Sequence, residues 1–196
     1  MTDRIDRLRA ALQQTREALE AEFDKRREAI AYRVQGSRVE FERDLRARHR
    51  AARESLGSFL SRTRPTVVLT APVIYALIVP FVLLDLCVTI FQAVCFPVYG
   101  IPKVRRRDHI AIDRQHLAYL NGLQKLNCIY CGYANGLISW TREIASRTEA
   151  YWCPIKHARR VADPHDRMTA FADYGDADGF MEQTETRRRA IAGNGE

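Results

Sequence analysis

The sequence predicts a mostly α-helical chain made of a long N-terminal helix, a membrane hairpin or span, and a small helical-hairpin Cys/His domain. Three observations lead to this fold class. Apolar residues recur every eleven positions in a charged N-terminal region, residues 66–101 carry a single charge, and Cys and His residues beyond them follow a metal-site spacing.

Charge divides the chain into four segments. We expect a long charged helix at residues 1–62, a membrane anchor at 66–101, a basic and aromatic Cys/His domain at 103–160, and a flexible acidic tail at 161–196. The net charge of +7 comes from the first and third segments. Such segregation indicates separate roles for the segments.

Cysteine usage and the N-terminal residues indicate a reducing compartment. The five cysteines are an odd number, two of them lie in the apolar run, and the first ten residues are too charged for a signal peptide. Arg greatly outnumbers Lys, which is typical of GC-rich bacterial genomes. The expected location is the inner (cytoplasmic) membrane of a bacterium, with the soluble parts facing the cytoplasm.

The N-terminal helix is predicted from composition and spacing. Residues 3–56 contain no Pro and only one Gly, Gly36, and are rich in Ala, Arg, Glu and Leu. Two apolar series of period eleven, offset by four residues, form one seam with a slight right-handed drift. The seam comprises Leu8, Leu12, Leu19, Phe23, Ile30, Val34, Phe41 and Leu45, continuing to Ala52 and Leu56.

A seam this narrow on a charged helix predicts pairing through it as a coiled coil, with a second copy or with another protein. The alternative is a solvated helix that packs once against its own domain. Nucleic acid is not expected as a partner, because acidic residues are interspersed along the whole helix.

Residues 66–101 are too long for one upright span and slightly short for two. Asp85 lies near the middle, and the three prolines of this run interrupt it. One topology is a single tilted span over roughly 67–86, with Asp85 near the headgroups. The favoured topology is a hairpin that turns near Pro80–Asp85 and returns both ends to the cytoplasmic side.

Basic residues on both flanks support the hairpin, since such residues stay in the cytoplasm. The residues that follow the run are expected to rest on the membrane surface, where they attract anionic lipids. The preceding flank contains Arg53, Arg62 and Arg64, and the following flank contains Lys103, Arg105, Arg106 and Arg107.

The segment that follows the membrane run is predicted to form a helical hairpin. Helices are expected at 108–126 and 137–151, with a turn bracketed by Gly132 and Gly136. Cys128, Cys131, Cys153 and His157 have the spacing C-x2-C-x21-C-x3-H, which suits a tetrahedral zinc site. The same ligands could hold an iron–sulfur cluster.

Two other interpretations stay open for these four residues: reduced cysteines buried as small hydrophobic groups, or a thiol redox pair. An unbroken helix over 137–151 would separate Cys153 from the CxxC pair. In the acidic tail, residues 174–185 partly match a calcium-binding loop, although Tyr174 stands where an acid is required.

No nucleophile–base set, Gly-rich phosphate loop or carboxylate pair is evident, so catalysis is not expected. The sequence predicts a membrane-anchored, non-catalytic scaffold or accessory subunit with a zinc-stabilised Cys/His domain. The alternatives are a membrane-associated redox or iron–sulfur protein and a membrane-shaping hairpin protein.

Overall fold

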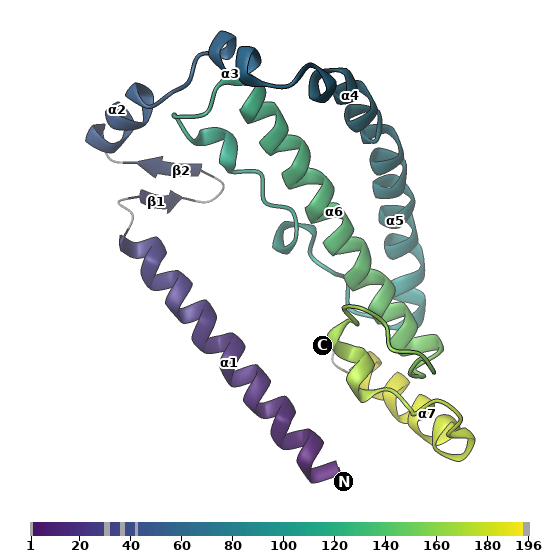
Figure 1. Ribbon diagram of the computed structural model, residues 1–196. Coiled ribbons are helices and arrows are strands. Elements are labelled where there is room, and N and C mark those ends of the chain that lie inside the picture. Colours follow the sequence, from purple (N-terminus) through teal and green to yellow (C-terminus); the bar gives the residue numbers. More distant parts are fainter. Residues whose placement is uncertain (1, 30–31, 36–37, 42, 194–196) are drawn as a thin grey trace. The chain divides into compact units, whose positions relative to one another are not determined.

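The computed structural model is mostly helical and describes residues 2–29, 32–35, 38–41 and 43–193 (Figure 1). The chain divides into two compact units. The first comprises Met1–Phe59 with Asp113–Lys125, and the second comprises Leu60–Ile112 with Leu126–Glu196. Each unit is considered by itself.

The first unit begins with a helix and continues with a β-hairpin rather than with more helix. In chain order it contains α1 (Thr2–Ala29), β1 (Tyr32–Gln35), β2 (Arg38–Phe41) and α2 (Arg43–Ala51), and α3 (Leu56–Arg62) crosses its boundary. The antiparallel strands pair Tyr32 with Phe41 and Val34 with Val39. These β-branched and aromatic residues alternate with polar ones, a pattern that favours strands.

The prediction of one helix over residues 1–62 is therefore wrong beyond Ala29. The first half of the seam lies on α1, but Val34 and Phe41 lie in strands and Leu45 lies in α2. Ile30 lies outside the described residues. The period of eleven thus does not describe one continuous helical face, although the described seam residues from Leu8 to Leu45 all lie in helices or strands.

The second unit contains one long apolar helix. α4 (Pro65–Ala76) and α5 (Ile78–Tyr99) are separated only by the non-helical residue Leu77, and together they form a 35-residue stretch that is long and apolar enough to cross a membrane. The helix passes through Pro80 and Asp85 without a turn. The favoured hairpin topology is therefore wrong, because the chain does not reverse direction there.

A second long helix, α6 (Gly122–Trp152), replaces the predicted helical hairpin. Residues 101–121 are irregular apart from the short 3-10 helices η1 (Arg106–Asp108) and η2 (Arg114–His116), so the helix expected at 108–126 is largely absent. α6 then runs unbroken through Gly132 and Gly136.

The start of α6 has a local cause. The Asn121 side chain accepts a hydrogen bond from the Gln124 amide at 2.9 Å, and the Gln124 side chain accepts one from the Asn121 amide at 2.9 Å. This reciprocal pair is the geometry of a capping box, which satisfies two amides that a helix start leaves free.

Gly136 lies inside α6 because the chain passes too close for a side chain. A Cβ placed there would lie 2.7 Å from Ile110 Cα and 2.8 Å from the His109 carbonyl oxygen. The glycine interpreted as a turn residue is thus a contact point for residues 109–110.

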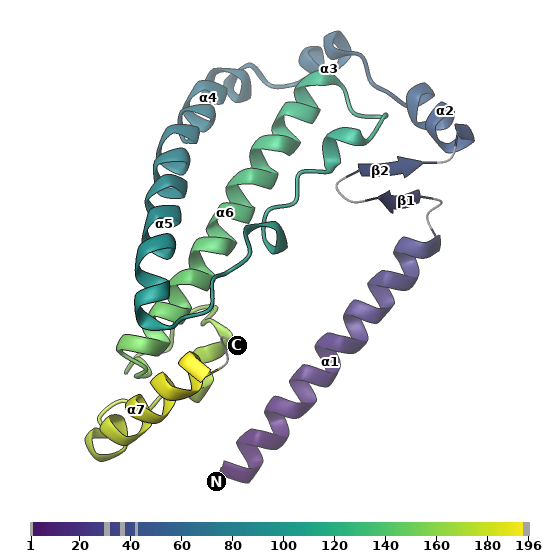
Figure 2. The same cartoon turned by 180° about the vertical axis from the view of Figure 1, so that it is seen from behind.

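α5 and α6 pack side by side and run parallel, as both views show (Figures 1 and 2). Tyr130 near the start of α6 donates to the carbonyl of Ile74 at 2.7 Å, and Tyr151 near its end stacks on Tyr99 at 5.2 Å between ring centroids. The core between them is formed by Phe96, Ile101, Val104, Leu137, Trp140 and Ile144.

Residues beyond α6 return to pack on it. The 3-10 helix η3 (Asp166–Ala170) is followed by Phe171, which is buried, and by α7 (Ala177–Gly193). Arg188 of α7 lies over the Tyr151 ring at 5.2 Å and donates to the Tyr151 carbonyl at 3.0 Å. The expectation of a flexible acidic tail is wrong for the described part of this segment.

Candidate membrane-binding surface

The face of α4–α5 that points away from α6 is apolar along its whole length. Leu69, Val79, Leu83, Ile90 and Val98 are between 54% and 78% exposed. Helical spacing places them on one side, together with the exposed residues Val68, Pro72, Val73, Ala76, Pro80, Val82, Leu86, Cys87, Ala93, Val94 and Pro97.

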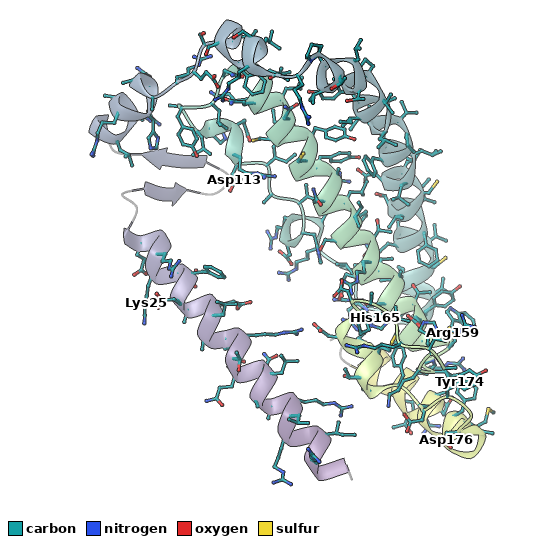
Figure 3. All side chains as sticks on the ribbon, viewed as in Figure 1. Lys25, Asp113, Arg159, His165, Tyr174 and Asp176 are labelled. Carbon is teal, nitrogen blue, oxygen red and sulfur yellow. The ribbon has the colours of Figure 1, made fainter. Side chains whose placement is uncertain are left out.

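None of the exposed side chains of α4 and α5 is charged, and the polar ones among them are the hydroxyls of Thr66, Thr70 and Thr89. The side chains of this outer face project from the ribbon of α4 and α5 on the side away from α6 (Figure 3). At about 1.5 Å per residue, the 35-residue helix is about 52 Å long. A continuous apolar face of this length exceeds what a soluble monomer ordinarily exposes, and it indicates an interaction surface.

The opposite face carries a polar cluster centred on Asp85. Both terminal nitrogens of Arg106 donate to the carboxylate at 2.5 Å, and the Tyr133 hydroxyl donates to it at 2.8 Å. Thr89, one turn further along α5, donates at 3.4 Å. The Arg106 guanidinium also lies 5.7 Å from the centroid of the Trp140 ring.

This cluster gives Asp85 the partners that an ionised carboxylate requires next to an apolar helix. The Asp85 side chain is 12% exposed, while that of Arg106 is 47% exposed, so the pair opens to solvent on the arginine side. Burial raises the pKa of the Tyr133 hydroxyl, and its hydrogen bond to the Asp85 carboxylate raises it further.

A second polar contact fixes the chain that follows α5. The Val104 amide donates to the Gln92 side chain at 2.6 Å, and the Val104 carbonyl accepts from the Trp140 indole at 3.2 Å. Both backbone groups of a buried residue are thereby satisfied. The contact holds residues 101–109 along α5, which places Arg106 opposite Asp85.

The basic residues after the apolar run consequently divide into two groups. Arg106 is committed to Asp85, whereas Lys103, Arg105 and Arg107 remain exposed. The spacing of these basic residues does not indicate this division. The sequence feature that points to an ion pair is Asp85 itself, because a charged residue in an apolar run usually has a partner.

The four residues proposed as zinc ligands are spread along the chain. Cys128 and Cys131 lie in the first half of α6, and Cys153 follows its last residue. At about 1.5 Å per residue, Cys131 and Cys153 are about 33 Å apart along the helix axis. Among the described residues, no group of three or more His, Cys, Asp or Glu side chains is positioned to hold a metal ion.

The partial calcium-loop match has a different structural role. Asp176 accepts a hydrogen bond from the Gly179 amide at 2.9 Å, at the start of α7, and Glu185 pairs with Arg189 at 3.2 Å. Both acids thus stabilise α7. Asp176 caps its N-terminus, and Glu185 forms a salt bridge with a residue one turn further along the helix.

An ionic network ties η3 to the middle of α6. Glu143 accepts hydrogen bonds from Arg167 at 2.7 Å and from Arg147 at 2.9 Å, and Arg147 also donates to the Pro102 carbonyl at 2.7 Å. Burial raises the pKa of Glu143, but the hydrogen bonds from Arg167 and then Arg147 outweigh it, so the pKa lies below its ordinary value of 4.5.

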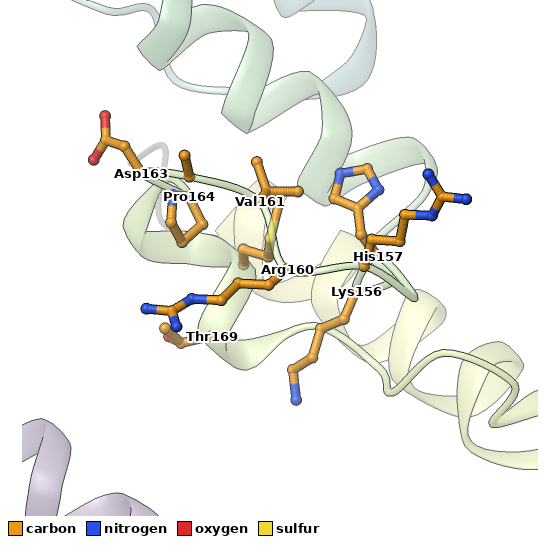
Figure 4. A pocket seen from close by; sticks show the side chains of 10 residues that line it. Lys156, His157, Arg160, Val161, Asp163, Pro164 and Thr169 are labelled. Carbon is orange, nitrogen blue, oxygen red and sulfur yellow. The ribbon is translucent and has the colours of Figure 1, made fainter.

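Beyond the end of α6, a basic loop borders a hollow of about 400 Å³ (Figure 4). It is lined by Lys156, His157, Arg159, Arg160, Val161, Ala162, Asp163, Pro164, Met168 and Thr169. Lys156 pairs with Asp173 at 2.6 Å, and Asp163 pairs with Arg142 at 3.0 Å.

Comparisons of the chain with protein-family models, with curated proteins and with solved structures find no match. The function is therefore inferred from the geometry of the chain itself.

Proposed function

We propose that the protein is a membrane-anchored, non-catalytic scaffold or accessory subunit, held at the membrane by the outer face of α4 and α5. The observation that carries this proposal is the absence of any charged group among the exposed side chains of α4 and α5, which are apolar apart from three threonines. Transfer of exposed apolar area out of water is favourable by about 25 cal/mol per Å². Side chains such as Leu69 at 78% exposure and Val98 at 76% exposure gain most from contact with lipid.

The anchor lies in the plane of the membrane surface in this proposal. An upright helix of about 52 Å exceeds the hydrocarbon layer of about 30 Å. A crossing centred on α5 would also carry Arg106, 47% exposed, into hydrocarbon. A helix in the interface keeps the outer face among acyl chains and the Asp85–Arg106 pair toward water.

This orientation keeps both basic flanks on one side, as the hairpin topology would have done. Arg62 and Arg64 precede α4, and Lys103 and Arg105 follow α5. Basic flanks are retained in the cytoplasm, so we place the protein on the cytoplasmic face of a bacterial inner membrane. Membrane lipid is thus its first partner.

The scaffold role is assigned to α1, whose apolar side chains are exposed on one face. Ile5, Leu8, Leu12, Leu19 and Phe23 are between 45% and 62% exposed. Their spacings of three, four, seven and four residues place them in one stripe. This stripe fits a helix of a second copy or of another protein.

Thiol accessibility on vesicles tests the anchor and its orientation together. The probe is a membrane-impermeant maleimide, and mass spectrometry reads each site. Cys87 on the outer face and Cys131 on α6 are both exposed in the protein alone. Vesicles should protect Cys87 and leave Cys131 reactive, which makes Cys131 the internal control.

Cysteines introduced as Leu69→Cys and Val98→Cys separate the two orientations. These positions are about 43 Å apart along the helix, so an upright crossing cannot bury both in hydrocarbon. Protection at 69, 87 and 98 supports the in-plane anchor. Protection at 69 and 87 with a reactive 98 would replace it by a crossing, and no protection at any position would refute membrane anchoring.

A further inference from the structure

The loop beyond α6 offers cationic groups that the described part of the protein does not neutralise. Among the described residues, His157, Arg159 and Arg160 take part in no ion pair or hydrogen bond. The acids on either side are occupied, because Asp163 pairs with Arg142 and Asp173 pairs with Lys156. In Figure 4, Asp163 points away from Lys156.

The loop is also held in place at both ends. On its N-terminal side, the Lys156 amide donates to the Ala172 carbonyl at 2.8 Å. On its C-terminal side, Arg142 donates to the Asp163 carbonyl at 2.6 Å and pairs with its carboxylate. His165, just beyond, contacts Glu149 at 2.8 Å. A cationic loop fixed in this way loses little conformational entropy when it binds an anion.

The chemistry of the loop suits a phosphate group. Arginine forks match the oxygens of phosphate in a bidentate manner, and an imidazole nitrogen is another donor. In Figure 4, Arg160 and His157 extend in different directions, so each of them would contact a separate phosphate. No backbone hydrogen bond is donated by residues 157–162 within the described part of the chain, so these amides also have the capacity to donate to an anion. The hollow of about 400 Å³ beside the loop accommodates a headgroup-sized ligand.

The position of the loop indicates where the phosphate comes from. Tyr99, at the end of α5, contacts Tyr151 and Trp152 with ring centroids 5.2 Å and 5.3 Å away. Trp152 is 49% exposed, and such aromatic clusters mark the boundary between acyl chains and headgroups. Lys156 follows Trp152 by four residues, which limits their separation to about 14 Å.

We propose that the cationic loop carrying His157, Arg159 and Arg160 binds the phosphates of anionic phospholipid headgroups. This inference depends on the proposed function, because it places the site at the membrane that the outer face of α4–α5 contacts. It adds a specific lipid contact to an anchor that otherwise recognises only hydrocarbon.

Modification of arginine by phenylglyoxal, read by mass spectrometry on the full chain, tests the site without a variant. We expect vesicles of phosphatidylglycerol to protect Arg159 and Arg160, and vesicles of phosphatidylcholine alone not to. Equal protection by both would mean simple coverage by membrane and would overturn the headgroup site. Equal protection by inorganic phosphate without vesicles would assign the site to a soluble phosphate instead.

Flotation with vesicles provides the quantitative test. The double variant Arg159→Gln/Arg160→Gln should bind phosphatidylglycerol vesicles about 30-fold more weakly than wild type, at about fivefold per arginine near an anionic surface. The charge-matched control is Arg46→Gln/Arg50→Gln on α2, which removes the same two positive charges elsewhere. In a buffer whose salt screens the general effect of net charge, this control should bind phosphatidylglycerol vesicles within about twofold of wild type.

The outcomes separate the two proposals. Normal flotation of the double variant with phosphatidylcholine, combined with a selective loss on phosphatidylglycerol, supports both. An equal loss for the control and the double variant would overturn the site while leaving the anchor intact. Failure of the wild-type protein to float with either vesicle would refute the anchor itself.

Discussion

Gly136 offers a sharp test of how the chain is packed, because a single methyl group should disturb it. In Gly136→Ala, the new Cβ would lie 2.7 Å from Ile110 Cα and 2.8 Å from the His109 carbonyl oxygen. Both neighbours are backbone atoms, so the contact cannot be relieved by turning a side chain. Residues 109–110 would have to move away from α6, or the helix would have to shift.

The expected change in the free energy of unfolding follows from two opposing effects. Overpacking of this kind costs about 1–3 kcal/mol, and backbone neighbours favour the upper part of that range. Replacing a glycine inside a helix returns up to about 1 kcal/mol. The net loss of about 1–2 kcal/mol corresponds to a melting temperature about 2–8 °C lower for a chain of this size.

Gly122→Ala is the matched control, since it lies at the start of the same helix and a Cβ there meets nothing within 4 Å. Thermal unfolding in detergent micelles, followed by the fluorescence of Trp140 and Trp152, reports on the unit that contains Gly136. We expect the control to melt at or slightly above the wild-type temperature. If Gly136→Ala melted as high as the control, residues 109–110 would not lie against α6, and the approach of Arg106 to Asp85 would lose its support.

Three further predictions follow from the polar contacts and the cysteines. Asp85→Asn and Arg106→Gln should each lower the free energy of unfolding by about 1–3 kcal/mol, and together by less than their sum; additive losses in this double-mutant cycle would mean that the pair is not formed. Glu143→Gln should be less stable than wild type at neutral pH, and the difference in stability should shrink as the pH falls below 4.5. The reason is that a carboxyl whose pKa is lowered in the folded state contributes stability above its unfolded pKa and loses this contribution as it protonates. A difference in melting temperature that stays equal down to about pH 3 would contradict this. Purified protein should hold less than one zinc ion per chain by elemental analysis, because α6 keeps the proposed ligands apart. For the same reason, Cys128→Ser and Cys153→Ser should melt at the wild-type temperature. One zinc ion per chain that is lost on either substitution would show that two chains assemble the site.

The long apolar helix was predictable because its signal is local. A run from 66 to 101 with one charge can only be a membrane segment or a buried core, and it forms a single long helix. The turn predicted near Pro80 was wrong. Pro80 cannot donate to the carbonyl four residues earlier, yet the helix accommodates this with one irregular residue, Leu77.

The N-terminal region shows how one spacing can fit two structures. Val34 and Phe41 satisfy the period of eleven, but they also alternate with polar residues within β1 and β2. Local alternation prevailed over the longer period, because a β-hairpin obtains its hydrogen bonds from residues a few positions away. The exposed stripe of α1 is what remains of the predicted seam.

The polar cluster and the close approach at Gly136 could not be derived from the sequence. Arg106 is 21 residues from Asp85, and Tyr133 is 48 residues from it. Glycines four residues apart allow either a turn or a close contact inside a helix, and the choice depends on which distant segment packs there. That segment, residues 109–110, was itself expected to be helical.

The separation between Asp85 and its partners also sets an order of events during synthesis. At about 5–20 residues per second, Tyr133 emerges from the ribosome about 2–10 s after Asp85. For that interval the apolar helix exists without α6 to cover it. The nascent chain therefore presents all sides of this helix at once, and contact with a bilayer at this stage would occur before the chain can fold back upon itself.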